Sequence, residues 1–282
     1  MPSSSLSLVT ARSFLFVPGN RPERFEKAAR SGADAVVLDL EDAVPLADKA
    51  AARAAVQAAW PMLRGLGVPL VVRMNAVNHA LGSEDLQLLR QLEGLDGVMV
   101  PKAESAPDLA LVQAALPATP ILPLIESAAG YHALSSIAGA SNVLRLVIGH
   151  IDFMADTGLQ CSEDEAELAP LRFAVAMATR SSQLAPAVDG VTVAINDDDQ
   201  LRRDASRMLR YGFGAKLCIH PRQVPVIHAV MAPSADDVAW AQRVLDANAQ
   251  SGGAAVQLDG RMVDLPVVLQ AERLLARVAR AR

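Results

Sequence analysis

The chain has 282 residues, of which 51% are hydrophobic and 20% charged, and its formal net charge is −5. This weakly acidic balance, without long runs of like charge, argues against a nucleic acid or an anionic membrane surface as a partner, because both attract clustered Lys and Arg. No window approaches 18 uninterrupted apolar residues, so we expect no membrane-spanning helix.

Eight short runs rich in Val, Ile and Leu recur along the chain, as expected of strands in a buried parallel sheet. They cover residues 13–17, 35–40, 70–74, 97–100, 121–125, 144–148, 190–195 and 216–219. Helical spacing between them predicts helices over residues 22–31, 48–62, 84–92, 107–115, 131–138, 168–184 and 199–211. Eight strands alternating with helices predict an α/β fold, the (β/α)8 TIM barrel. The alternative, an open doubly wound sheet, is less favoured because no G-x-G-x-x-G turn follows the first run.

The chain continues beyond what a barrel requires. We predict a TIM barrel catalytic domain over residues 1–231 and a C-terminal extension over residues 232–282. The extension is expected to hold a helix over residues 236–249 capped by Ser234, a hairpin turning at Asp259-Gly260, and a terminal helix over residues 267–279. Such a helix and hairpin extension is interpreted as a lid or an oligomerisation arm.

The cysteines and the first ten residues indicate in which cellular compartment the protein is expected. Cys161 and Cys218 lie far apart in the sequence, and the first ten residues lack both the basic start and the apolar core of a secretory leader. We therefore expect a cytoplasmic protein whose cysteines are inert.

Acidic side chains follow two neighbouring strands at the rim where a barrel enzyme places its chemistry. Glu126 directly follows the fifth run, and Asp152 follows the sixth after a short turn. Carboxylates without a His or Cys ligand cluster favour a hard cation such as Mg²⁺, with Mn²⁺ as an alternative ion. The competing interpretation is that each carboxylate only caps the next helix.

Arg73 directly follows Val71-Val72 near the end of the third run and offers a planar fork for a substrate carboxylate. Its alternative role is an ion pair with Glu41 or Asp42, which follow the second run. Clustered carboxylates repel one another unless a cation neutralises them, so we expect this group to lie beside the metal or Arg73.

Lys102 follows the fourth run and is a candidate Schiff-base lysine, because class I aldolases also use lysines on barrel strands. We favour a structural ion pair of Lys102 with Glu104 or Asp39 instead. His150 is likewise expected to pack or hydrogen-bond rather than to catalyse.

A set of short motifs occurs in a specific order along nearly the whole chain. They are residues 12–19, 38–44, 72–75, 100–104, 124–127, the Gly149-x-x-Asp152 turn, 217–223 and 259–264. Together they resemble the HpcH/HpaI aldolase/citrate lyase family, and most of all its citrate lyase beta-subunit-like branch.

The resemblance implies a TIM barrel that binds Mg²⁺ and assembles as a homotrimer or hexamer, with the extension covering a neighbour's site. It implies a metal site of Glu126 and Asp152, substrate contacts from Arg73, Glu126 and Lys102, and a catalytic set of Arg73, Glu41, Asp42 and Asp264. Asp264 would act as an acid or base from the adjacent subunit.

The implied activity is a Mg²⁺-dependent carbon–carbon lyase. It would cleave a 3-hydroxy-3-carboxyacyl thioester of the citryl-, malyl- or citramalyl type into a 2-oxo acid and an acyl thioester, by a retro-Claisen reaction. The thioester would be carried by coenzyme A or by an acyl carrier protein. A thioester hydrolase on the same scaffold and a non-catalytic subunit of a lyase complex are the alternatives.

Overall fold

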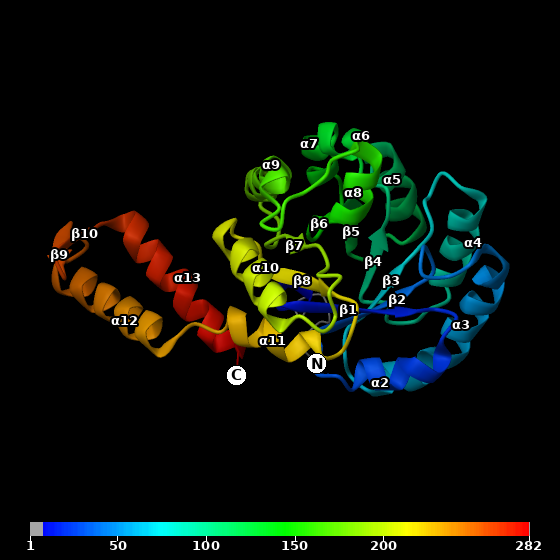
Figure 1. The fold of residues 1–282 in the computed structure, drawn as a ribbon, viewed down its shortest axis with the longest axis horizontal. Helices are drawn as coiled ribbons and strands as arrows, with labels where there is room; N and C mark the ends of the chain where they lie inside the picture. The colour runs from blue at the N-terminus through cyan, green and yellow to red at the C-terminus, as the bar shows by residue number, and fades with distance from the viewer. Residues whose placement is uncertain (1–7, 282) are drawn as a thin grey trace. The chain divides into compact units, whose positions relative to one another are not determined.

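The structure, a computed structural model, describes residues 8–281. The chain divides into two compact units, one that ends at Ile227 and one that begins at His228. Figure 1 shows the ribbon of both units, and each is described by itself below.

The first unit is a closed barrel of eight parallel strands in sequence order, with the first strand paired to the eighth. This confirms the predicted (β/α)8 barrel. The strands are β1 (Ser13–Pro18), β2 (Ala35–Asp39), β3 (Leu70–Arg73), β4 (Gly97–Val100), β5 (Ile121–Ile125), β6 (Val147–Ile148), β7 (Val188–Asp189) and β8 (Ala215–Cys218).

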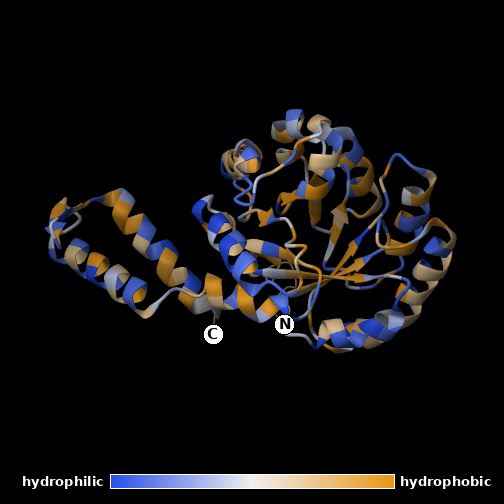
Figure 2. Cartoon of the chain, in the orientation of Figure 1, coloured by the Kyte–Doolittle hydropathy of each residue, from blue (hydrophilic) through white to orange (hydrophobic). Residues whose placement is uncertain are grey.

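Helices follow the strands and surround the barrel (Figure 1). In α3 the buried Ala52, Val56, Trp60 and Leu63 recur every three or four residues, which gives the helix one apolar face toward the strands. In Figure 2 the strands of the barrel are mostly hydrophobic, whereas the helices around them alternate between hydrophobic and hydrophilic residues. The helices are η1 (Pro22–Arg24), α2 (Phe25–Ala29), η2 (Leu46–Asp48), α3 (Lys49–Gly65), α4 (Ala80–Leu89), α5 (Ala106–Ala115), α6 (Ala128–His132), α7 (Leu134–Ala138), α8 (His150–Thr157), η3 (Ala166–Leu168), α9 (Ala169–Ser181) and α10 (Asp198–Arg210).

Arg145 closes the end of the barrel at which the strands begin. Its side chain is fully buried, lies 5.4 Å from the centre of the Phe14 ring, and donates hydrogen bonds to the carbonyl oxygens of Leu8, Ala11 and Pro186. Those carbonyls precede β1 and β7. Because this end is sealed, the opening into the barrel lies at the carboxyl ends of the strands.

The seventh strand differs from the prediction over residues 190–195. Only Val188 and Asp189 form β7, and the segment after them leaves the barrel. Thr192 makes hydrogen bonds to side chains and not to a neighbouring strand. Its hydroxyl donates to the carboxylate of Asp204, and its backbone carbonyl accepts from the side-chain amide of Gln223. The alternating apolar residues that suggested a strand therefore belong to a loop beside the barrel mouth.

The second unit is built around a helical hairpin. After α11 (Gln223–Met231), which crosses the boundary, it consists of α12 (Ala235–Gln250), β9 (Val256–Leu258), β10 (Arg261–Val263) and α13 (Leu265–Ala281). The Ser234 cap is confirmed as a capping box with Asp237, and Asp259-Gly260 forms the turn, both residues at positive φ. Among residues 8–281, no helix is long and apolar enough to cross a membrane.

Candidate active site

A cavity of about 70 Å³ lies at the mouth of the barrel, where the carboxyl ends of the strands meet. Arg73, Glu126 and Asp152 line it together with apolar side chains such as Phe16 and Leu217. The structure therefore brings together the three residues that the sequence placed at the rim on separate strands.

Glu126 is the most buried carboxylate of this cavity, at 3% exposure. Its Oε1 accepts a hydrogen bond of 2.6 Å from the backbone N–H of Lys102, whereas its Oε2 has no hydrogen-bond partner among the described residues. Burial, together with the charges of Glu41 and Asp152, raises the pKa of Glu126 to about 8. The capping interpretation does not hold for Glu126, because Ser127 caps the following helix.

Gly149 keeps the space beside Glu126 open. A Cβ at this position would lie 2.5 Å from Oε2 of Glu126 and 2.8 Å from its Cβ. The helix α8, which the sequence did not predict, starts directly after Gly149 and carries the half-buried Asp152 in its first turn. The glycine and the short helix together allow the carboxylates of Glu126 and Asp152 to approach one another.

The two carboxylates fit a hard divalent cation. A buried carboxylate oxygen without a partner, beside a second carboxylate, is costly unless a cation compensates it. No group of three or more His, Cys, Asp or Glu within residues 8–281 forms a complete metal cage. Two carboxylates that leave the other positions to water and substrate are typical of Mg²⁺ sites.

Arg73 is fixed by two acidic residues, Asp39 at the end of β2 and Glu41 just after that strand. Its Nε and Nη2 donate to the two carboxylate oxygens of Asp39, at 2.7 and 2.6 Å, and its Nη1 lies 3.0 Å from Glu41. Its guanidinium also lies 4.8 Å from the centre of the Phe16 ring. Of the five N–H groups of the guanidinium, the hydrogen bonds to Asp39 use two, which leaves the others for a ligand in the cavity. Burial lowers the pKa of Arg73, but the hydrogen bonds and charges of Asp39 and Glu41 outweigh it and raise the pKa.

The predicted partner of Lys102 was wrong. Its Nζ lies 2.7 Å from Glu41, whereas Glu104 accepts a hydrogen bond from Ser127. Burial alone would lower the pKa of Lys102, but the contact with Glu41 outweighs it and the pKa is raised. A raised pKa keeps the amine protonated, whereas a Schiff-base mechanism requires a neutral amine. Asp42 lies at the exposed edge of this group, 3.9 Å from the Lys102 ammonium.

A buried network behind the site was not predicted. Lys49 is 7% exposed, and its ammonium donates to the carbonyl oxygens of Leu40 and Glu41 and to the side chain of Asn75. Asn75 in turn donates two hydrogen bonds to the fully buried Asp85. These contacts hold the loop after β2, which carries Glu41, and the loop after β3, which begins directly after Arg73. The position of Lys49 at the start of an amphipathic helix gives no sequence signal for this role.

The remaining predicted site residue belongs to the other unit. Asp264 is half-buried and directly precedes α13 in the C-terminal unit. His150, in contrast, lines the mouth cavity, and its ring packs so closely on Gly190 that a Cβ there would lie 2.1 Å from Nδ1.

Comparison with known proteins agrees with this geometry. Residues 12–221 match the family model of HpcH/HpaI aldolase/citrate lyase. A citrate lyase subunit beta-like protein of Deinococcus radiodurans is 38% identical over 280 residues, which cover 95% of this chain and 97% of the relative. A (3S)-malyl-CoA thioesterase of Cereibacter sphaeroides is 30% identical over 270 residues, covering 94% of each chain. The structure of CitE from Mycobacterium tuberculosis in complex with magnesium, acetoacetate and coenzyme A matches with a TM-score of 0.83 and 35% identity, over 96% of this chain and 99% of that one. The chain therefore belongs to the HpcH/HpaI aldolase/citrate lyase family, in its citrate lyase beta-subunit-like branch.

Proposed function

We propose that the protein is a Mg²⁺-dependent carbon–carbon lyase that cleaves a 3-hydroxy-3-carboxyacyl thioester to a 2-oxo acid and an acyl thioester. The observation that carries this proposal is the buried, unpartnered Oε2 of Glu126, which lies in one cavity with Asp152 and Arg73. The magnesium, acetoacetate and coenzyme A bound to the related CitE support the same substrate class.

Each residue of the mouth has a defined part in this proposal. Glu126 and Asp152 would hold Mg²⁺, or Mn²⁺ in its place, and the bound ion acts as a Lewis acid that lowers the pKa of the substrate hydroxyl. Arg73 would bind the substrate carboxylate through the N–H groups that Asp39 does not use. Asp39 and Glu41 keep that guanidinium charged and oriented, and Lys102 in turn neutralises Glu41. Asp42 would add a negative charge beside the Lys102 ammonium at the outer edge of the site.

The C-terminal extension, residues 232–282, is proposed to cover the site of a neighbour in a homotrimer or hexamer. Asp264 would then protonate the acyl thioester enolate from the adjacent subunit. Mixed oligomers test this arrangement. Glu126→Gln and Asp264→Asn are each expected to be inactive alone, and mixing them is expected to restore part of the activity because some sites then combine two intact subunits. Mixtures as inactive as the parents would show that Asp264 does not act on a neighbour.

A thioester hydrolase is the second candidate, because the Cereibacter sphaeroides relative is a (3S)-malyl-CoA thioesterase. Product analysis separates the two activities. The protein is incubated with malyl-, citramalyl- and citryl-thioesters of coenzyme A or an acyl carrier protein, with and without EDTA. Phenylhydrazine traps any 2-oxo acid, and a disulfide reagent reports free thiol. Metal-dependent oxo acid supports the lyase, whereas free thiol without oxo acid supports the hydrolase.

A non-catalytic role in a lyase complex is distinguished by the metal-site variants. Glu126→Gln and Asp152→Asn are expected to abolish Mg²⁺-dependent turnover while circular dichroism shows an unchanged fold, because the barrel core does not depend on the ion. Full function in both variants would favour the non-catalytic subunit.

A further inference from the structure

A larger cavity adjoins the mouth cavity on the side of β6 and β7, and we call it the side cavity. It is lined by α8, by the loop before η3 and by the loop after β7, and its volume is about 460 Å³. The mouth cavity has about 70 Å³, which is roughly the volume of two water molecules. His150, Ile151 and Val191 line both cavities, so these three residues form the wall between them.

One side of the side cavity is apolar. Ile151, Met154 and Ala155 come from α8, and Val191 and Val193 come from the loop after β7. Such a surface fits an alkyl chain, because burying methylene groups against apolar side chains is favourable.

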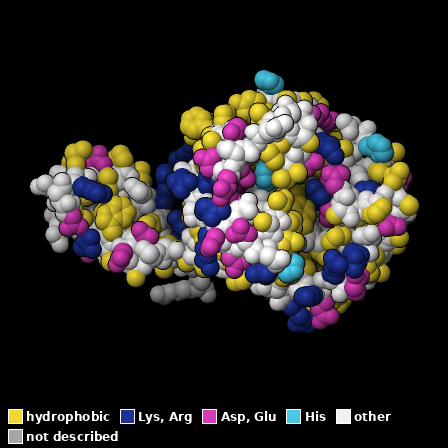
Figure 3. Space-filling view, in the orientation of Figure 1, with side chains coloured by type: hydrophobic (Ala, Val, Ile, Leu, Met, Phe, Trp, Pro, Cys, Tyr) yellow, Lys and Arg dark blue, Asp and Glu magenta, His cyan; other side chains and the backbone are white. Residues whose placement is uncertain are grey.

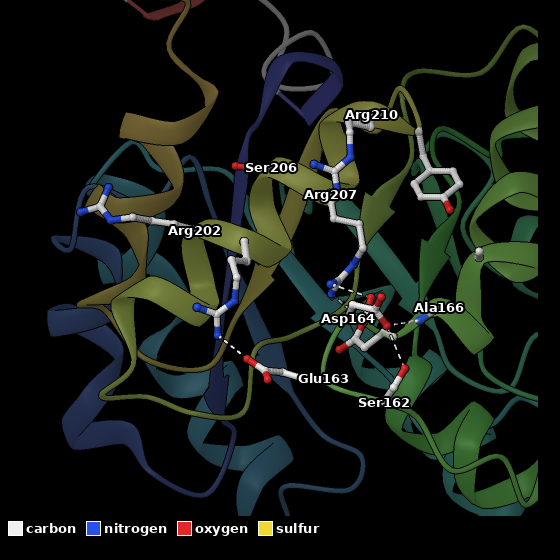
Figure 4. A pocket seen from close by; sticks show the side chains of 12 residues that line it. Ser162, Glu163, Asp164, Ala166, Arg202, Ser206, Arg207 and Arg210 are labelled. Carbon is white, nitrogen blue, oxygen red and sulfur yellow. Dashed lines mark hydrogen bonds and ion pairs between the residues drawn. The ribbon is translucent and has the colours of Figure 1, made fainter.

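The acidic side chains on the other side already have partners. Glu165 and Asp204 lie 2.8 and 2.7 Å from Nη2 of Arg207. Arg207 belongs to α10, and Figure 3 shows Lys and Arg side chains gathered over this side of the barrel. In Figure 4, Arg207 reaches from the helix toward Asp164 in the facing loop. The two carboxylates that line the side cavity are therefore neutralised within the chain and need no cationic ligand.

The ring of His150 is held firmly in the wall. It is 4% exposed, and a Cβ at Gly190 would lie 2.1 Å from its Nδ1, so the ring packs directly on the Gly190 backbone. Its Nε2 lies 3.9 Å from Glu165, which Arg172 and Arg207 fix in turn. That distance is too long for a hydrogen bond, and Nδ1 has no hydrogen-bond partner among residues 8–281. The ring therefore contributes its volume to the wall.

A substrate held by Arg73 would extend toward this wall. The eight strands close in sequence order, so β3 and β7 are four strands apart and lie opposite each other. Arg73 ends β3, whereas His150 follows β6 and Val191 follows β7. A 2-oxo acid whose carboxylate binds Arg73 would therefore direct its side chain across the mouth. The thioester carrier is larger than either cavity and would leave through the open end of the barrel.

We propose that His150 is a specificity-determining residue. Its ring separates the mouth from the side cavity, and so limits the substituent on the carbon that bears the hydroxyl and carboxylate to a short one. Removal of the ring would join the two cavities and admit a longer alkyl substituent. This inference rests on the proposed function, because it places a 2-oxo acid at Arg73.

Binding of 2-oxo acids of increasing length to the full-length protein tests the role of His150. Calorimetry in the presence of MgCl₂ compares glyoxylate, pyruvate and 2-oxohexanoate. We expect wild-type protein to bind pyruvate at least about tenfold more tightly than 2-oxohexanoate. His150→Ala is expected to bind 2-oxohexanoate about tenfold more tightly than the wild type does, because three further methylene groups then enter an apolar cavity. The ratio of the two affinities within each protein removes any general effect of the substitution on the metal site.

Two further variants serve as controls. His150→Leu is similar in size and should keep the wild-type preference for pyruvate, since the ring acts through its volume. Ala155 lines the side cavity, so adding Ala155→Phe to His150→Ala should fill that space and remove the gain for 2-oxohexanoate. Circular dichroism checks that each variant is folded.

The outcomes separate this inference from the proposed function. Equal wild-type affinity for pyruvate and 2-oxohexanoate would overturn the role of His150 without any variant, and would leave the proposed lyase site standing. A folded His150→Ala protein without the gain, or a gain that survives Ala155→Phe, would do the same. No Mg²⁺-dependent binding of any of the three 2-oxo acids by the wild type would overturn both proposals.

Discussion

Replacing Gly149 by Ala tests the metal site without changing its charge. The added Cβ would lie 2.5 Å from Oε2 of Glu126, whereas ordinary contacts begin at 3.4 Å, so the carboxylate has to move by about 0.9 Å. Gly149 has φ −104°, which Ala also adopts, so the effect is steric rather than a backbone strain. Contact with the Cβ of Glu126, at 2.8 Å, prevents relief by a rotation of the carboxylate alone.

A displacement of this size exceeds what Mg²⁺ tolerates. The ion requires oxygen ligands near 2.0–2.1 Å, within about 0.2 Å. We therefore expect Gly149→Ala to lower Mg²⁺ affinity at least tenfold, or about 1.4 kcal/mol, and the overpacking to lower the free energy of unfolding by about 1–3 kcal/mol. Titration calorimetry with MgCl₂ measures the first quantity and urea denaturation the second.

Gly139→Ala is the control, because its Cβ would lie 3.4 Å from the nearest atom, the Ser135 carbonyl oxygen. It should leave Mg²⁺ affinity unchanged. Wild-type Mg²⁺ affinity in a folded Gly149→Ala protein would refute the assignment of Glu126 as a metal ligand.

Two further predictions concern buried polar groups. Lys49→Met removes a buried ammonium that donates three hydrogen bonds. The carbonyls of Leu40 and Glu41 keep donors from Asn75 and Val44, but Oδ1 of Asn75 loses its donor. Urea denaturation should show a loss of about 3 kcal/mol, and a loss below about 1 kcal/mol would mean that water replaces the ammonium. Burial raises the pKa of Cys218 to about 12, so its thiolate fraction at pH 8 is only ~10⁻⁴. A disulfide reagent should therefore titrate only the partly exposed Cys161 in native protein and both thiols in guanidinium, and two fast native thiols would contradict this.

The sequence predicted the barrel well where strands are continuous apolar runs. Gly97–Val100 and Ile121–Ile125 were predicted with the bounds that the structure shows. The prediction was less accurate where the strands are short. In the sixth run, Arg145 turns to the sealed end of the barrel and only Val147–Ile148 pair as β6.

The candidate site was predictable in position but not in its contacts. Strand ends of a barrel converge, so Arg73, Glu126 and Asp152 could be placed at one rim. The partner of Lys102 could not, because this residue adopts a left-handed backbone, with φ 48°, while its N–H bonds to Glu126 and its ammonium to Glu41. No residue pattern marks a non-glycine residue in that conformation.

Closure of the barrel also determines when, during synthesis, the edge of strand β1 is covered by its second neighbour. Strand β1 pairs on one side with β8, whose residues 215–218 are synthesised almost at the end of the barrel. At ~5–20 residues per second, the nearly 200 residues in between take roughly 10–40 s. During that time the apolar β1, which includes Phe14 and Leu15, is an open sheet edge, and Arg145 is needed to seal the end beneath it. Fragments that stop before β8 are therefore expected to aggregate during synthesis unless a chaperone covers that edge.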